Sequence, residues 1–402
     1  MEMIVQCCAG LDVHKTNVVA CVRRIDPAGR VHEAIQTFGT MTAEVLALSD
    51  WLAEQGVTHV AMESTGVSWK PIFNLLEGRF EVLLVNPGHM KKVPGRKTDV
   101  KDCQWIAQLL QHGLLRGSFV PPKPIRELRD LKRQRSQLIA EKAGVANRIQ
   151  KVLEDANIKL ASVATDVPGV SGRAMIRALI AGQEDPAELA ELARQRLRRK
   201  LPALRTALQG TRTEHHRFLL QVLMSHLEAL EGLIGRLNAR IEATMAPFAA
   251  EVERLVTIPG VDQRTAEVLV AEIGTDMERF PSAGHLASWA GMSPGNDQSA
   301  GKRRSGRTTK GDWWLRAALT QAAWAASHTK GTSLSAQYHR LAKRHGKKRA
   351  LVALGHTLLT IAYYVLKRGT CYIELGAEFL DRLDPDRTAR GLSTKSIANR
   401  SA

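Results

Sequence analysis

The hydrophobic positions of the first 120 residues follow two different periods. Short apolar or β-rich runs predict strands, and apolar residues spaced three or four positions apart predict helices. The predicted strands are 7–11, 18–23, 31–38, 58–62 and 81–85, and the predicted helices are 43–55, 68–76 and one that opens at Asp99 and Asp102. Three strands followed by alternating helices and strands predict a mixed α/β layer domain.

Beyond a proline-containing linker at 113–124, the pattern is helical. One long polar helix has a single apolar seam, because Arg135 and Lys142 interrupt the second. A later helix has both seams of a heptad repeat, which predicts an antiparallel helical hairpin, an intermolecular coiled coil or an ordinary bundle helix. We expect coiled-coil helices here, and a dimer or tetramer. The seam residues are Leu131, Leu138, Val145 and Val152 in the first helix, and Leu220, Leu223, Leu227, Leu230, Ile234, Leu237 and Ile241 in the second.

The C-terminal third predicts a mainly α-helical domain. Residues 256–274 have the pattern of a helix-hairpin-helix, in which backbone N–H groups around Gly260 would bind a DNA phosphate. Residues 167–172 are a weaker copy, and a plain turn between helices is the alternative for both. A glycine-rich basic loop at 291–312 and two apolar helices follow. The predicted domains are 1–120, 121–250 and 251–380, with a disordered tail at 381–402.

The net charge of the chain indicates what kind of molecule it binds. The chain has 402 residues, 44% of them hydrophobic, and a formal net charge of +17, which indicates a polyanionic partner. A membrane is disfavoured, since the longest apolar stretch, 351–366, is shorter than the roughly 20 residues of a span, and no signal peptide is visible. The five cysteines are an odd number without C-x-x-C spacing, which favours reduced thiols in a cytoplasmic protein.

Four carboxylates are the candidate chemistry. Asp12 and Glu63 each follow an apolar strand, and Asp99 and Asp102 open a helix with i, i+3 spacing that places them on one face. Strand ends and a helix start can converge, and carboxylates are the ligands that Mg²⁺ prefers. We expect these acids to hold two Mg²⁺ ions for phosphodiester chemistry. The alternative for each acid alone is a solvated surface carboxylate.

Basic clusters are the candidate nucleic-acid contacts, with a solvated face as the alternative. A further cluster lies at 194–205. Trp313 and Trp314 follow the loop cluster and could stack on bases, although core packing is the favoured interpretation. The residues predicted to bind phosphates are Lys302, Arg303, Arg304, Arg307 and Lys310 in the loop and Lys347 and Lys348 beyond it, besides Gly260.

Two groups of motifs resemble a known family. The first group is Gly10-Leu11-Asp12-Val13-His14-Lys15, Met62-Glu63-Ser64-Thr65-Gly66 and Lys97-Thr98-Asp99-Val100-Lys101-Asp102, and the second runs from Ile258-Pro259-Gly260-Val261 through Trp289-Ala290-Gly291 to Ser299-Ala300-Gly301-Lys302. They resemble the DEDD signature and the second domain of insertion-sequence transposases of the IS110 group, which includes the Piv-type DNA invertases. The resemblance covers residues 1–115 and 251–340.

This resemblance implies a fold and a mechanism. The N-terminal domain would be RuvC-like, a variant of the ribonuclease H fold, and its four acids would bind magnesium. A serine of the second domain would attack DNA and form a covalent phosphoserine link, and a bridge RNA would pair with donor and target DNA. Ser299 is the implied nucleophile. Family members often have two serines or Ser-Gly-Gly there, so Ser293 and Ser305 remain alternatives.

Three other functions compete with a bacterial transposase acting at the nucleoid. A Holliday-junction resolvase would use the four acids and water, with no serine. An actin-like ATPase or sugar kinase would need a later glycine-rich adenosine motif, which the C-terminal half lacks. A non-catalytic DNA-binding protein would need none of the acids. The target sequence, the guide RNA's existence and fold, and the number of subunits do not follow from the sequence.

Overall fold

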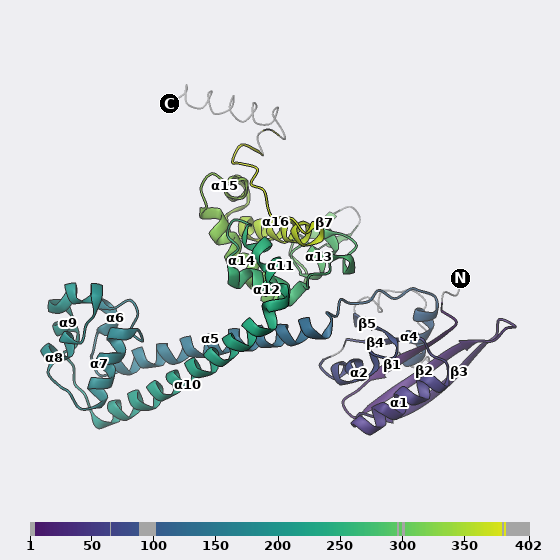
Figure 1. The fold of residues 1–402 in the computed structure, drawn as a ribbon, viewed down its shortest axis with the longest axis horizontal. Helices are drawn as coiled ribbons and strands as arrows, with labels where there is room; N and C mark the ends of the chain where they lie inside the picture. Colours follow the sequence, from purple (N-terminus) through teal and green to yellow (C-terminus); the bar gives the residue numbers. More distant parts are fainter. Residues whose placement is uncertain are drawn as a thin grey trace. The chain divides into compact units, whose positions relative to one another are not determined.

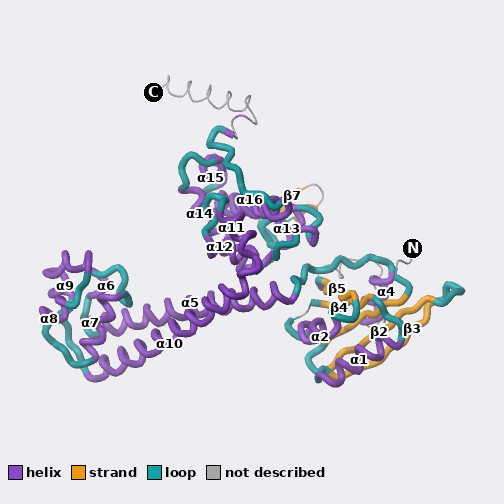
Figure 2. Tube along the Cα trace, in the orientation of Figure 1, coloured by secondary structure: helices purple, strands orange, loops and turns teal. Residues whose placement is uncertain are grey.

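The computed structural model describes residues 5–64, 66–87, 102–295, 297–299, 302–379 and 382, with the backbone alone for 297–299 and 302–305. The chain separates into two compact units, Met1–Val120 and Pro121–Ala402. Figure 1 and Figure 2 show an α/β first unit and a mostly helical second unit. The predicted disordered tail lies outside the described residues, except for Arg382.

The first unit is built on a five-stranded mixed sheet in the order β3-β2-β1-β4-β5. β1 pairs antiparallel with β2 and parallel with β4, β2 pairs antiparallel with β3, and β4 pairs parallel with β5. The strands and helices predicted for this unit are confirmed within a few residues at their ends, except that the predicted helix start at Asp99 lies outside the described residues. They are β1 (Cys7–Val13), β2 (Asn17–Ile25), β3 (Val31–Gly39), α1 (Thr42–Glu54), β4 (His59–Glu63), α2 (Trp69–Leu76), β5 (Glu81–Val85) and α4 (Asp102–Gln111).

The two faces of this sheet are covered by different helices. Ala9 and Leu11 of β1 belong to the core that α1 and α2 form, whereas Cys8 packs with α4 on the opposite face. Gly10 also faces α4, because a Cβ atom there would lie 2.2 Å from the carbonyl oxygen of Cys103. Only glycine allows this approach of strand and helix backbones. All five cysteines of the chain are free thiols, and burial raises the pKa of Cys8 to about 12.

Two long helices dominate the second unit, α5 (Lys123–Asp155) and α10 (Glu214–Met245). They pack antiparallel, because residue numbers fall along α10 as they rise along α5 (Figure 1). Arg135 Nε lies 2.5 Å from Asn238 Oδ1, Lys142 Nζ lies 2.7 Å from Glu231, and Asp155 lies 2.9 Å from His216. The antiparallel hairpin, one arrangement that the heptads allowed, is therefore present within the chain. Arg135 and Lys142, which interrupt the apolar seam, supply polar contacts between the helices.

A group of short helices connects the far ends of α5 and α10, and its pattern was not recognised in the sequence. Its apolar residues, among them Leu160, Met175, Leu189 and Leu204, share one core with the seam of the long helices. Each helix is too short to be stable alone, so tertiary packing decides its formation. The helices are α6 (Leu160–Val163), α7 (Val170–Ile180), α8 (Pro186–Glu191), η1 (Gln195–Lys200) and α9 (Leu201–Ala207).

The remainder of the second unit is arranged around α16 (Lys347–Arg368), which packs against α11, α13, α14 and α15. Three helices follow the basic loop in the described part of the chain. Two of them, α14 and α16, are the expected apolar helices, and the third, α15, was missed because its surface is largely polar. The other elements are η2 (Ala246–Phe248), α11 (Ala249–Val256), α12 (Gln263–Ile273), η3 (Met277–Arg279), α13 (Ala283–Trp289), β6 (Asp297–Ser299), β7 (Lys302–Ser305), α14 (Trp313–His328) and α15 (Ser333–His345).

Two helical segments of the described chain are long and apolar enough by composition to cross a membrane, Glu214–Val256 and Lys347–Arg368. The apolar run at 351–366 is part of α16, which is longer than the run itself. Leu354, Leu358 and Tyr363 of α16 are buried within the unit. A core helix of this kind meets the same length and composition criteria as a span.

A buried group of charges joins α5 to the helices around α16. Arg133 of α5 donates to both carboxylate oxygens of Glu272, at 2.9 and 2.8 Å, and to Asp312 at 2.6 Å. Arg129 lies 3.0 Å from the same Glu272 carboxylate, whose side chain is 2% exposed. Burial raises the pKa of Glu272, while the hydrogen bonds from Arg133 oppose that rise. Asp312 also caps α14 by accepting from the Leu315 N–H at 2.8 Å.

Replacing Glu272 with glutamine is expected to destabilise the second unit by about 3 kcal/mol, because Arg129 and Arg133, both half-buried, would lose the charge of a carboxylate that is 2% exposed. Urea unfolding followed by circular dichroism measures this loss. Glu278→Gln is the matched control, since Glu278 is 79% exposed and pairs with Lys367 at the surface, where such a pair contributes about 1 kcal/mol or less. Equal midpoints for the two variants would contradict the prediction.

Candidate active site and nucleic-acid interface

Asp12 and Glu63 lie side by side at the carboxyl ends of two parallel strands. The register of β1 and β4 pairs Gly10 with Ala61 and Leu11 with Met62, so the next step along both strands reaches Asp12 and Glu63. Successive side chains of a strand alternate between its faces. Since Ala61 packs on α4 as Gly10 does, both acids belong to the α4 face of the sheet.

Asp102 reaches the same face from the helix. It is the first residue of α4, and the next residue, Cys103, is the one whose carbonyl oxygen approaches Gly10. The close packing at Gly10 therefore brings the start of α4 against β1, two residues before Asp12. The Asp12 side chain is 27% exposed, and its Oδ2 lies 3.1 Å from His14 Nε2.

The fourth predicted acid, Asp99, lies outside the described residues. In the part of the chain that is described, no group of three or more His, Cys, Asp or Glu side chains lies close enough to hold a metal ion. The three described acids share one face and one region of the sheet without closing into a cage. These three carboxylates are suitable ligands for a divalent ion, because carboxylate oxygens are hard ligands. They lie on two neighbouring strands and at the start of the helix that packs against one of them.

The predicted nucleophile lies in a loop that is closed at its base. Gly291, with φ of +68°, and Gly311 pass so closely that a Cβ on Gly291 would lie 2.8 Å from the Gly311 backbone. The Gly295 N–H donates to the Arg307 carbonyl at 2.8 Å, and the neighbouring residues Pro294 and Thr308 form an isolated antiparallel β-bridge. Beyond this base β6 and β7 form a hairpin.

The three candidate serines occupy different positions along this loop. Ser299 ends β6 and pairs with Lys302, the first residue of β7, whereas Ser305 ends β7 and pairs with Asp297 at the other end of the hairpin. Ser293 is half-buried and precedes the base of the loop. Of the three, Ser299 is farthest along the chain from the closed base.

The described basic residues are exposed as expected, namely Arg307, Lys310, Lys347 and Lys348. Lys302, Arg303 and Arg304 lie on β7. The favoured core packing was wrong for Trp313, which is 67% exposed at the start of α14. Trp314 is half-buried, and the Arg133 guanidinium lies 6.0 Å from its ring centroid.

Gly260 has a structural role. Its φ is +86°, and a Cβ atom there would lie 2.4 Å from the Ala322 carbonyl oxygen of α14. The Asp262 carboxylate caps α12 by accepting from the Thr265 N–H at 2.8 Å, and hydrogen bonding from Thr265 lowers the pKa of Asp262. A negative charge thus occupies the N-terminus of the second helix of this hairpin. A phosphate contact at Gly260 remains a prediction.

Comparison with known proteins identifies the class. A DEDD-type family model described as "Transposase" matches residues 9–158, and a model described as "Transposase IS116/IS110/IS902 family" matches residues 252–339. Together the two models match more than half of the chain. They define a DNA transposase or recombinase, an enzyme. Within that class, the chain belongs to the IS110 family of insertion-sequence transposases.

Individual relatives agree with this assignment. The "Insertion element IS110 uncharacterized 43.6 kDa protein" of Streptomyces coelicolor is 28% identical over 304 residues, which cover 69% of this chain and 73% of that protein. The "Pilin gene-inverting protein" of Moraxella bovis is 34% identical over 117 residues, which cover 28% of this chain and 36% of that protein.

Proposed function

We propose that this transposase cleaves and exchanges DNA strands with two Mg²⁺ ions held by Asp12, Glu63, Asp99 and Asp102. Ser299 forms a covalent link to DNA, and a bridge RNA selects the donor and target. The strand register that sets Asp12 beside Glu63 on the α4 face carries the proposal. Donor and target DNA are the substrates, and the enzyme acts in the bacterial cytoplasm at the nucleoid.

Two finer features of the fold belong to this proposal. We assign the first unit to the RuvC-like variant of the ribonuclease H fold, which the strand order β3-β2-β1-β4-β5 supports. We treat α5 and α10 as a coiled coil through which a dimer or tetramer forms. Apolar residues on the outer surface of α10, such as Phe218 and Val222, are consistent with a further contact.

In this proposal the carboxylates, the serine and the basic residues have separate roles. The four carboxylates would hold divalent ions, and when bound these ions would supply electrostatic stabilisation of the charge that develops during phosphodiester exchange. The serine hydroxyl exchanges one phosphodiester bond for a phosphoserine bond and frees a DNA hydroxyl, so a second exchange can rejoin strands without an external energy source. Exposed cations of the loop and of α16 hold the phosphates and fix the strand's position.

A supercoiled plasmid that carries the ends of the element tests the proposal. Protein and co-purifying RNA are incubated with it in Mg²⁺ or in chelator, and the products are separated under denaturing conditions. We expect a protein–DNA adduct that depends on the metal. Metal-dependent cleavage with free 5′-phosphates and no adduct would favour the junction-resolvase alternative. Sequencing the co-purified RNA tests the guide, for which a discrete species encoded beside the gene is expected.

A further inference from the structure

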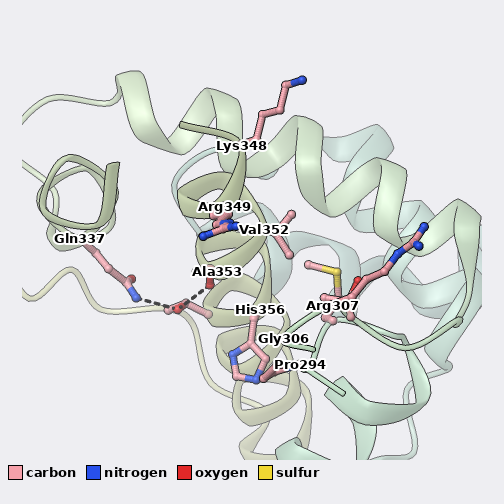
Figure 3. A pocket seen from close by; sticks show the side chains of 12 residues that line it. Pro294, Gly306, Arg307, Gln337, Lys348, Arg349, Val352, Ala353 and His356 are labelled. Atoms are coloured by element: carbon pink, nitrogen blue, oxygen red, sulfur yellow. Dashed lines mark hydrogen bonds between the residues drawn. The ribbon is translucent and has the colours of Figure 1, made fainter. Parts of the chain in front are cut away.

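A groove crosses one face of α16 in the second unit. Its volume is about 1130 Å³, slightly larger than the roughly 300–1,000 Å³ of typical small-molecule pockets. Figure 3 shows the groove between α15 on one side and, on the other, the closed base of the loop that carries Ser299, which includes Pro294 and Arg307. The lining residues are Met292, Pro294, Gly306, Arg307, Thr308, Gln337, Lys348, Arg349, Val352, Ala353, His356 and Thr357.

The charged groups of this groove are all cationic. Lys348 and Arg349 lie at the start of α16, Arg307 lies on the opposing loop, and no carboxylate lines the cavity among the described residues. Cations at a helix N-terminus oppose the helix dipole, and α16 has no acidic residue in its first turn to compensate. Neither Lys348 nor Arg349 forms an ion pair within the described chain. Their placement therefore serves an anionic ligand better than it serves the helix.

Besides these cations, the groove is lined by apolar and hydrogen-bonding side chains. Met292, Val352 and Ala353 supply apolar surface. Gln337 Nε2 donates to Thr357 Oγ1 at 2.9 Å, which leaves the amide oxygen of Gln337 able to accept from a ligand. The His356 ring forms no hydrogen bond with the described residues and is oriented toward the loop that carries Pro294 and Gly306 (Figure 3).

A groove with cations, apolar surface and hydrogen-bonding groups suits single-stranded nucleic acid better than a duplex. A duplex presents phosphates on its outside and keeps its bases stacked, so it would contact the cations without filling a recess. An unpaired nucleotide presents phosphates together with an apolar base face and hydrogen-bonding edges. The groove offers a partner for each of these groups.

We propose that the groove binds unpaired nucleotides, with Arg307, Lys348 and Arg349 on the phosphates and Gln337 and His356 at the base edges. The strand can be DNA opened at the recombination site or a single-stranded part of an RNA, since the two share this chemistry. The proposal rests on the nucleic-acid function proposed above, but it requires neither the metal nor the serine.

Equilibrium binding of the full-length protein to fluorescent oligonucleotides tests this assignment. The probes are a single DNA strand, the same strand with abasic residues at consecutive internal positions, its RNA counterpart and the DNA duplex. We expect the abasic strand to bind about tenfold more weakly than the intact strand, from the loss of one well-held base. The DNA and RNA arms show which strand the groove prefers. Equal affinity for intact and abasic strands would overturn the proposal.

Two variants locate the effect in the groove. Val352→Trp fills the cavity, and His356→Ala removes a base contact without adding bulk. Each is expected to weaken single-strand binding about tenfold and to leave duplex binding unchanged. Tyr364→Trp places a similar bulk on the exposed part of the same helix and should change neither. The proposal fails if His356→Ala binds single strands as the wild type does, or if both groove variants weaken duplex binding equally.

The same variants separate this proposal from the catalytic one. Asp12→Asn should bind single strands as tightly as the wild type, because Asp12 is not among the residues that line the groove. If single-strand binding is unaffected by the groove variants while metal-dependent adduct formation persists, only the groove assignment is lost. If adduct formation survives Asp12→Asn while the groove variants behave as expected, only the catalytic proposal is lost.

Discussion

Replacing Asp12 with asparagine is expected to lower the rate of DNA strand cleavage at least about 1000-fold, which corresponds to about 4 kcal/mol of transition-state stabilisation. Asparagine keeps the shape of the side chain but removes the charge that a divalent ion requires. Asp12 stands at the centre of the proposed site, since it neighbours Glu63 across the β1–β4 pair and lies two residues beyond the Gly10 contact with α4. Cleavage of end-labelled DNA in Mg²⁺ measures the loss.

DNA affinity should stay within about threefold of the wild type, because phosphate contacts to basic residues supply most of the binding energy. Asp50→Asn is the matched control. Asp50 is a 68% exposed acid of the same unit, on the α1 side of the sheet, and it pairs with Arg79 at 2.6 Å. Full cleavage activity in Asp12→Asn, or an equal loss in Asp50→Asn, would remove this site from the mechanism.

The first unit could be predicted well because its sequence patterns are local. Each strand is a short apolar or β-branched run, which is a local signal, and tertiary packing reinforces this preference. The α4 face was harder to predict. Gly10 is a single residue in an apolar run, and its contact with Cys103 joins segments far apart in the sequence. The sequence led us to expect that all four acids converge. The register sets Asp12 beside Glu63, and the glycine contact brings the start of α4 against β1. Convergence of the full set stays a prediction, because Asp99 lies outside the described residues.

The second unit was predicted less completely. The long helices α5 and α10 were found from their heptads, but the short helices between them lack a period long enough to detect. The hairpin β6–β7 was interpreted as part of a loop, because its strands are short and rich in charge. Gly260 was interpreted as a phosphate contact from its Pro-Gly turn, yet its positive φ and its packing against α14 explain the glycine without a ligand.

The groove residues Gln337 and His356 were not identified as functional, because each lies alone on a helix. A signal was present on α16, where Arg349, Val352, Ala353 and His356 follow the i, i+3, i+4, i+7 spacing of one face. This face mixes polar and apolar residues, so a hydrophobic period does not reveal it. Only the packing of α15 and the loop base around it shows that the face is hollow.

Replacing Ser299 with alanine is expected to abolish the covalent protein–DNA adduct while leaving DNA binding unchanged. Without the hydroxyl no phosphoserine bond can form, and the rest of the chain keeps its contacts to phosphate. Ser299 ends β6 opposite Lys302, and a cation beside the attacked phosphate would stabilise the charge that develops there. Denaturing electrophoresis of a reaction with labelled DNA detects the adduct directly.

Ser293→Ala and Ser305→Ala are the matched controls, because they remove the same hydroxyl from the same loop. Ser293 precedes the closed base, where Gly295 bonds to Arg307, and Ser305 lies at the base end of the hairpin. Both positions lie near the backbone contacts that close the loop, whereas Ser299 pairs with Lys302 at the opposite end of the hairpin. Adduct formation should therefore survive in both controls. An adduct that persists in Ser299→Ala and disappears in one of the others would assign the nucleophile to that serine instead.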